Sequence, residues 1–177
     1  YEKGRLVRAV TRGNGTEGDD ITANARLIRG LPGSLRSLSD EAHEVPVPDL
    51  IELRGEIHLT WAEFRRINAE REAEGSRTFA TPRNLAAGSI RHADPSVVEQ
   101  RNLGLVFYGI GACVPESARP ASQRELNGWL GRWSLPRVED IWTARGPDEL
   151  WAAVQALGRT RGGLAYPTDG AVIKLDD

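Results

Sequence analysis

The stretch "IELRGEIHL", residues 51–59, alternates apolar and ionisable side chains along its length. A period of two predicts a β-strand with one apolar face. Charged side chains on the other face need no function, because antiparallel strands often have one solvated face. Gly55 favours a different interpretation, since a glycine within a strand often marks the close approach of a ligand or of another backbone. The ionisable side chains of this strand are Glu52, Arg54, Glu56 and His58.

Composition places the chain among ordinary globular proteins. Its 177 residues suffice for one domain with its own core, and 40% are hydrophobic and 27% charged. The net charge of -2 excludes a chain-wide attraction to nucleic acid but leaves local basic patches open. A single cysteine, Cys113, excludes an internal disulfide and a multi-cysteine metal site, and favours a reducing cytoplasm. No apolar run approaches the length of a membrane span, so we expect no membrane partner.

The remaining pattern predicts strands and helices mixed without regular βαβ alternation, which favours an α+β fold with a largely antiparallel sheet in one domain. Further strands are expected over 5–10, 103–113 and 169–176, and a short helix ends near Gly30. A second short helix is expected over 83–91, and further helices over 61–74 and after Ser122 and Pro147. Tryptophans at helical spacing are predicted as core residues: Trp61, Trp129, Trp133 and Trp151.

Lys174 stands within the apolar stretch "TDGAVIK", residues 168–174, and is one of only two lysines, the other being Lys3. An unpaired buried ammonium is very costly, so this side chain must reach water, an anion or a ligand. The alternative is an edge-strand lysine that protects the sheet against aggregation. The strand pattern leaves both interpretations open.

Arginines occur in two further stretches that favour phosphate binding. Arg83 and Arg91 lie eight residues apart in "FATPRNLAAGSIR", so one broad helix face presents both, and guanidinium groups match phosphate oxygens. The alternative is a closely packed Ala/Gly helix with solvated arginines. Arg12 precedes the glycine-rich turn of "TRGNGTEGDD", which lacks the spacing of a phosphate-binding P-loop. The histidines show no metal-ligand spacing: His43, His58 and His92.

The order of these strings is more specific than any one of them. "TRGNGTEGDDIT", "LRGE", "FATPRNLAAGSIR", "VFYGIG" and "TDGAVIK" closely resemble, in this order, the adenylation domain of bacterial NAD+-dependent DNA ligases. The resemblance covers essentially all of residues 1–177. ATP-dependent ligases and capping enzymes share the fold and the short motifs but not the "PRN-AAGS-R" segment.

The resemblance implies a nucleotidyltransferase (ATP-grasp-like) fold, incomplete in this chain, with antiparallel sheets, flanking helices and a nucleotide held between the sheets. It also implies that Glu56 contacts the AMP ribose and the waters of a catalytic magnesium, and that Asp169 supports the same metal–water network. Tyr108 would stack on adenine, and Lys174 would reach the adenine edge and the α-phosphate. The arginines would bind phosphates, those of the nucleotide through Arg12 and Arg161 and those of DNA through Arg83 and Arg91.

The activity implied by the resemblance is the sealing of nicks during bacterial DNA replication and repair. AMP would pass from NAD+ to a lysine and then to the 5′-phosphate of the nick, with release of nicotinamide mononucleotide. The implied cofactors are NAD+ and Mg²⁺, and the implied partner is nicked duplex DNA. We expect a cytoplasmic, nucleoid-associated monomer.

The chain departs from the family pattern at one important motif. The family's nucleophile is a lysine in Lys-x-Asp-Gly, which this sequence lacks, and Lys3 in "YEKG" is not its counterpart. We therefore expect a fragment of a longer ligase that forms no lysyl-AMP alone. The alternatives are a non-catalytic nucleotide- or DNA-binding relative that has lost its nucleophile, and an unrelated α+β domain with chance motifs. Asn14 and Thr81 replace the usual aspartate and asparagine.

Overall fold

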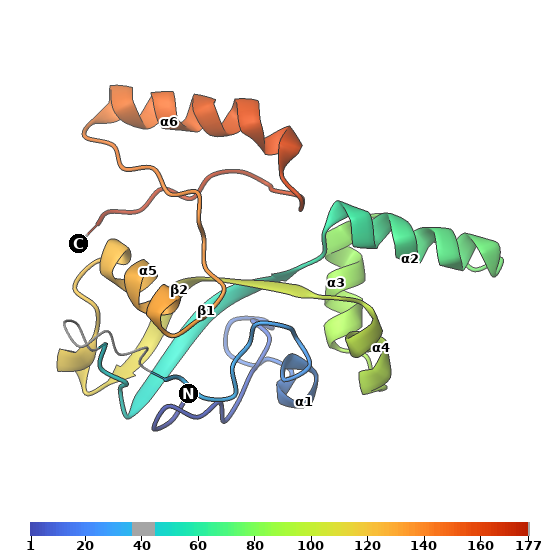
Figure 1. Ribbon diagram of the computed structural model, residues 1–177, viewed down its shortest axis with the longest axis horizontal. Helices are drawn as coiled ribbons and strands as arrows, with labels where there is room; N and C mark the ends of the chain where they lie inside the picture. Colours follow the sequence, from blue (N-terminus) through green and yellow to red (C-terminus); the bar gives the residue numbers. More distant parts are fainter. Residues whose placement is uncertain (37–44, 177) are drawn as a thin grey trace.

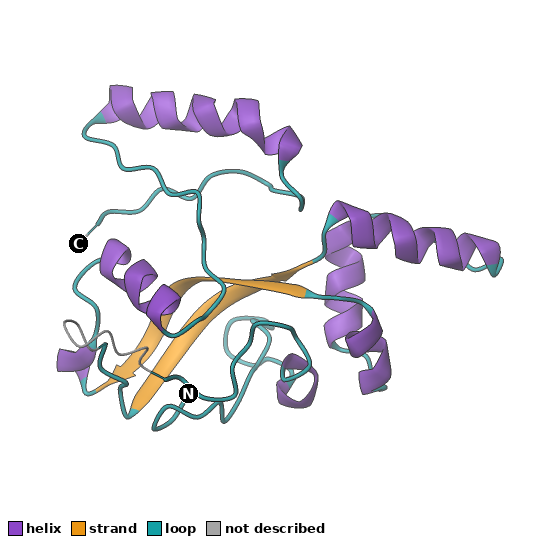
Figure 2. Ribbon diagram, in the orientation of Figure 1, coloured by secondary structure: helices purple, strands orange, loops and turns teal. Residues whose placement is uncertain are grey.

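A two-stranded antiparallel sheet forms the centre of the computed structural model, which describes residues 1–36 and 45–176. Strand β1 (Leu50–His58) pairs with β2 (Gly104–Val114), and both strands are confirmed where the sequence predicts them (Figures 1 and 2). Two irregularities in the register bend the pair, one between Ile51 and Leu53 and one between Arg54 and Gly55. In the second, Tyr108 is the extra residue of a β-bulge, because Arg54 lies opposite Gly109 and Gly55 opposite Phe107.

Helices surround this sheet, so a mixed fold with antiparallel pairing is confirmed, while the nucleotidyltransferase fold stays a prediction. The helices are α1 (Thr22–Ala25), α2 (Trp61–Ala73), α3 (Pro82–Ile90), α4 (Pro95–Gln100), α5 (Gln123–Arg132) and α6 (Pro147–Thr160), with 3₁₀ turns η1 (Glu116–Ala118) and η2 (Arg161–Gly163). The helices α2 to α5 each begin at a polar cap. The Thr60 hydroxyl accepts a hydrogen bond from the Glu63 N–H (3.2 Å), and the Ser122 hydroxyl accepts one from the Glu125 N–H (3.1 Å).

The sheet connects two apolar clusters. Near one end of β1, Ile51 and Phe107 pack with the apolar face of α5, where Leu130 and Trp133 are buried. Beyond the other end, Leu59 packs with α2, α3 and α4, in a cluster that includes Leu85. Because β1 carries apolar side chains into both clusters, its polar face is held in a fixed position between α5 and α3.

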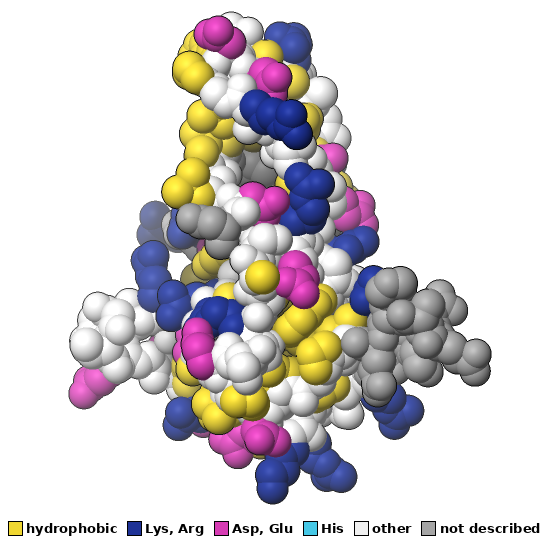
Figure 3. Space-filling view, turned by 90° about the vertical axis from the view of Figure 1, so that its left-hand side faces the viewer, with side chains coloured by type: hydrophobic (Ala, Val, Ile, Leu, Met, Phe, Trp, Pro, Cys, Tyr) yellow, Lys and Arg dark blue, Asp and Glu magenta, His cyan; other side chains and the backbone are white. Residues whose placement is uncertain are grey.

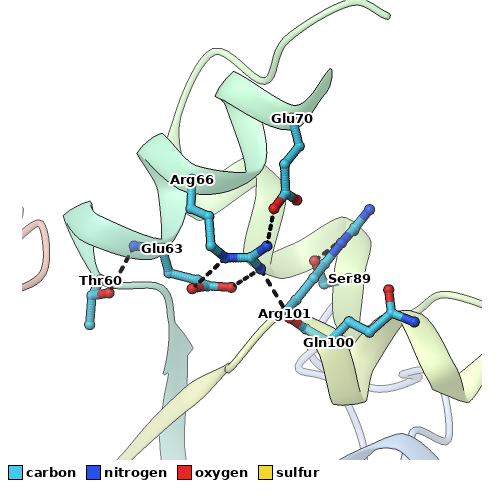
Figure 4. Close-up of polar contacts among 7 residues, drawn as sticks. All are labelled: Thr60, Glu63, Arg66, Glu70, Ser89, Gln100 and Arg101. Carbon is cyan, nitrogen blue, oxygen red and sulfur yellow. Dashed lines mark hydrogen bonds and ion pairs between the residues drawn. The ribbon is translucent and has the colours of Figure 1, made fainter. Parts of the chain in front are cut away.

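A polar network joins α2, α3 and α4 (Figure 4). The Arg66 guanidinium donates to the carboxylates of Glu63 and Glu70 and to the Gln100 carbonyl. Arg101 Nη1 donates to the hydroxyl of the buried Ser89 on α3 (2.9 Å). These contacts position the helix that carries Arg83.

Two predicted strands are wrong. Residues 5–10 form only isolated bridges, such as those of Arg5 with Ser34 and of Val10 with Asp20, and no continuous ladder. Residues 169–176 form no strand, since none of the described segments offers them a hydrogen-bonding ladder. The predicted helix before Gly30 is confined to α1, and α4 was not predicted.

The core prediction for the tryptophans holds at α5 and the residue that follows it, and fails for α2 and α6. Trp129 and Trp133 are buried, whereas Trp61 is 38% and Trp151 62% exposed. No residue of α6 is buried, and its apolar residues Val154 and Leu157 are only partly covered. Figure 3 shows hydrophobic side chains on the surface of the upper part of the molecule, where α6 lies. No described helix combines the length and apolarity needed to cross a membrane.

Candidate functional site

The polar face of β1 lies opposite glycines of β2, which leave room for its side chains. His58 pairs with Gly104, and a Cβ at that glycine would lie 2.5 Å from the imidazole Nε2. A Cβ at Gly111 would overlap the Glu52 carboxylate. The alternation predicted from residues 51–59 is therefore confirmed, and β2 is shaped to accommodate the ionisable side chains.

Gly55 has a structural explanation. A Cβ at this position would lie 2.7 Å from the Val106 carbonyl oxygen and 3.1 Å from the Phe107 ring. The close approach inferred from the sequence is therefore that of the neighbouring strand. Gly55 gives no argument for a ligand.

One cluster of the site joins two carboxylates through an arginine. Arg83, in the first turn of α3, contacts Asp169 (Nη1 to Oδ2, 2.8 Å) and Glu56 on β1 (Nη2 to Oε1, 3.7 Å). The side chains are 65%, 88% and 56% exposed, respectively. An exposed bridge of this kind stabilises a fold little, so its value to the fold does not explain the convergence of these charges.

A second cluster lies farther along the same face of the sheet, around Lys174. Its Nζ donates to the Tyr108 carbonyl (2.7 Å) and to Gln123 Oε1 (3.0 Å), and it lies 5.4 Å from the centre of the Tyr108 ring. Partial burial lowers the pKa of Lys174. A Cβ at Gly109 would lie 4.0 Å from the ammonium nitrogen, which places Lys174 on the side of the sheet that carries Arg54.

Residues 168–176 connect the two clusters, running from α3 across the sheet to α5 (Figure 1). Asp169 lies against Arg83 at one end, and Lys174 contacts β2 and α5 at the other. The segment therefore brings a carboxylate and an ammonium to one face of the sheet, next to Glu56 and Tyr108. The edge-strand interpretation of Lys174 is wrong, because the residue lies in no strand.

The other predicted arginines lie apart from each other. Arg161 Nη2 donates to the Thr168 carbonyl (2.9 Å) and so fixes the start of this segment. Arg91 pairs with Asp19 (3.0 Å) beside an open depression of about 480 Å³ between α1 and the end of α3. Arg12 is exposed at the start of the glycine-rich turn, where its carbonyl accepts the Gly15 N–H.

Two residues of this face were not selected from the sequence. Gln123, the first residue of α5, contacts both Lys174 and the Tyr108 carbonyl. Nothing in the local pattern distinguishes it from any other polar residue near a helix N-terminus. His58 lies 4.7 Å, ring to ring, from Tyr166, and burial lowers its pKa. Its Nδ1 is buried and meets no hydrogen-bond partner in the described part of the chain.

The polar face of the sheet offers few side chains that could bind a metal ion. Within residues 1–36 and 45–176 no three His, Cys, Asp or Glu side chains are grouped as a metal cage. Glu56 and Asp169 supply two carboxylates, both in contact with Arg83. Two carboxylates fit a hydrated Mg²⁺, which retains several waters and commonly takes one or two carboxylates in nucleotide sites.

Comparisons with known proteins agree with one another. The family model for the NAD-dependent DNA ligase adenylation domain matches residues 1–177. "DNA ligase 1" of Opitutus terrae is 56% identical over 99% of this chain and 26% of its own length. "DNA ligase 2" of the same organism is 51% identical over the whole chain, and a "DNA ligase" of Trichlorobacter lovleyi is 42% identical, each over 24% of its own length. The chain thus spans about a quarter of the relatives it matches.

Proposed function

Because this chain belongs to the NAD-dependent DNA ligase adenylation domain family, we propose that it forms the nucleotide-binding part of a ligase that seals nicks in duplex DNA. NAD+ would supply AMP, which passes to an enzyme lysine and then to the 5′-phosphate of the nick. The main support is the convergence of Glu56, Arg83 and Asp169 on the polar face of the sheet, beside Tyr108 and Lys174.

Each proposed role follows from the chemistry of the side chain. Tyr108 is 41% exposed, and its aromatic ring suits stacking on adenine. The Lys174 ammonium lies over this ring, from where a cation would stabilise negative charge on the α-phosphate in the transition state. Glu56 and Asp169 would hold a hydrated Mg²⁺, whose role when bound is to neutralise phosphate charge.

The arginines would contact phosphates. We assign Arg12 and Arg161 to the nucleotide, and Arg83 and Arg91 to DNA. Guanidinium groups bind phosphates in a bidentate manner, and each of the last two already holds a carboxylate that a phosphate would replace. Nicked duplex DNA in the cytoplasmic nucleoid is the proposed partner of a monomeric enzyme.

The second candidate is a nucleotide- or DNA-binding relative without catalysis. The full-length protein, incubated with nicked duplex, Mg²⁺ and either NAD+ or ATP, distinguishes the two. We expect the protein to seal the nick with NAD+ but not with ATP. The variant Lys174→Ala should not seal it with either nucleotide. Binding of NAD+ or DNA without any sealing would instead support the second candidate.

A further inference from the structure

Lys174 lies on a segment that no β-ladder holds in place. Residues 168–176 have neither helix nor strand structure, and Val172 and Leu175 on either side of the lysine are 82% and 79% exposed. Apolar packing therefore does not determine the position of the ammonium. Its position must come from polar contacts of the lysine and of its close neighbours.

Those contacts come mainly from the first turn of α5. Gln123 Oε1 accepts from the Lys174 ammonium (3.0 Å), while Gln123 Nε2 donates to the Tyr108 carbonyl (3.2 Å), which also accepts from Lys174 (2.7 Å). The three groups form a closed triangle in which one amide binds both the cation and the second acceptor of that cation. An amide is suited to this task because it presents a donor and an acceptor on one side chain.

The residue next to Gln123 holds the same segment at a second point. The backbone N–H of Arg124 donates to Asp176 Oδ1 (2.9 Å), and its guanidinium Nε lies 3.4 Å from Asp176 Oδ2. This backbone hydrogen bond is the main cause that lowers the pKa of Asp176. Two adjacent residues of α5 thus hold residues 174 and 176, about fifty positions away in sequence.

We propose that Gln123 is a positioning residue for Lys174, holding the ammonium over the Tyr108 ring while Arg124 secures the segment through Asp176. The proposal rests on the function proposed above for Lys174. Without the amide, the ammonium keeps only the Tyr108 carbonyl and gains freedom to turn toward solvent. Gln123 touches no reacting atom in this scheme, and acts on the reaction through the lysine.

The test uses the full-length protein and measures single-turnover transfer of AMP from NAD+, the KM for NAD+ and the melting temperature. Gln123→Met keeps the length of the side chain and removes both hydrogen bonds. Gln123→Glu keeps an acceptor for the ammonium. Gln155→Met, on the exposed side of α6, is the matched control.

We expect Gln123→Met to slow AMP transfer about 3- to 10-fold, the range for one net hydrogen bond, with KM and melting temperature near wild type. Gln123→Glu should lose less activity than Gln123→Met, because a carboxylate oxygen still accepts from the ammonium although it cannot donate to the Tyr108 carbonyl. The control should match wild type.

Normal transfer in Gln123→Met, beside an inactive Lys174→Ala, would overturn the positioning role and leave the proposed function standing. Equal losses in the Met and Glu variants, or a loss that follows a fall in melting temperature, would also overturn it. Full activity of Lys174→Ala would instead contradict the role proposed for the lysine itself.

Discussion

Glu56 is the residue on which the proposed chemistry depends most directly. Its backbone lies in β1, paired with Val106, so the strand fixes its direction. Its carboxylate is 56% exposed and, within residues 1–36 and 45–176, its ion pair is the long contact with Arg83 at 3.7 Å. A carboxylate held by a rigid strand, with little bonding of its own, is available to a hydrated cation and to a ribose.

Replacing Glu56 by alanine should affect nick sealing but not the stability of the fold. In the full-length protein we expect Glu56→Ala to reduce nick sealing on the order of 10²–10³-fold, as for loss of one preorganised electrostatic contact. The melting temperature should hardly change, because exposed substitutions of this kind cost less than about 0.5 kcal/mol. Glu99→Ala, an exposed glutamate of α4, is the control for both assays. Near-normal sealing by Glu56→Ala would return this carboxylate to the solvated-face interpretation.

His58 gives the same strand face a pH dependence. Burial lowers its folded-state pKa below the ordinary value of 6.5, while backbone and charge contributions from Glu56 oppose the shift. The unfolded chain therefore binds the proton first as pH falls below that value, and the fold loses stability. We expect the melting temperature to fall between pH 7 and 5 less steeply in His58→Gln than in wild type.

The control for this titration is His92→Gln, which removes an exposed imidazole that accepts the Asp94 N–H. In this variant the melting temperature should fall between pH 7 and 5 as steeply as in wild type. If the melting temperature of His58→Gln fell between pH 7 and 5 as steeply as that of wild type, groups other than His58 would cause the loss of stability at low pH.

At the scale of elements, β1 and β2 form a pair in which glycines and side chains are matched. Gly55 illustrates the requirement, because the Val106 carbonyl oxygen occupies the space of its missing side chain. A backbone atom moves less readily than the end of a long side chain. Substitution here therefore strains the strand pairing itself.

We expect Gly55→Ala to lower stability by about 1–3 kcal/mol, the usual cost of overpacking. The opposite result is expected for Gly128→Ala, in the middle of α5, where an added Cβ meets nothing within 4 Å and alanine favours the helix by roughly 0.5–1 kcal/mol. Thermal melts of both variants check the pair. A neutral Gly55→Ala would mean that the strands separate more easily than their register indicates.

The elements that the sequence predicted well are those with local signals. Alternation at 51–59 and the polar residues Thr60 and Ser122 specify β1, α2 and α5 through short-range chemistry. The stretch 169–176 has an equally apolar pattern, but a strand also needs a partner, and the pattern says nothing about one. The same holds for two contacts between residues distant in sequence, Arg83 with Asp169 and Gln123 with Lys174. Both depend on how the chain folds in three dimensions, which local patterns do not show.

At the scale of the whole molecule, the site is assembled from distant parts of the chain. β1 supplies Glu56, α3 supplies Arg83, β2 supplies Tyr108, and residues 168–176 supply Asp169 and Lys174. The family resemblance allowed all five to be chosen in advance from their motifs. Composition, periodicity and spacing alone indicated the strand face, the isolated lysine and the arginines Arg12, Arg83 and Arg91.

The same assembly limits what this chain does by itself. It contains two amines on side chains, Lys3 and Lys174, and neither belongs to a Lys-x-Asp-Gly motif. Lys3 lies in a tight turn at the N-terminal end, where its backbone N–H donates to the Asp49 carbonyl. The Lys174 ammonium already donates to two oxygens. Covalent transfer requires a neutral amine as nucleophile, and the lysine that the family resemblance implies for this role, in Lys-x-Asp-Gly, is not among these residues.

We therefore expect the 177-residue chain, incubated with NAD+ and Mg²⁺, to keep its unmodified mass. Intact-mass spectrometry measures this outcome directly, and the full-length protein serves as the positive control, with an AMP adduct expected. An adduct on the short chain would be mapped by peptide digestion and by the variants Lys3→Ala and Lys174→Ala. AMP on Lys174 would make this residue a nucleophile instead of a group that stabilises charge, and the roles assigned to Tyr108 and Gln123 around it would change accordingly.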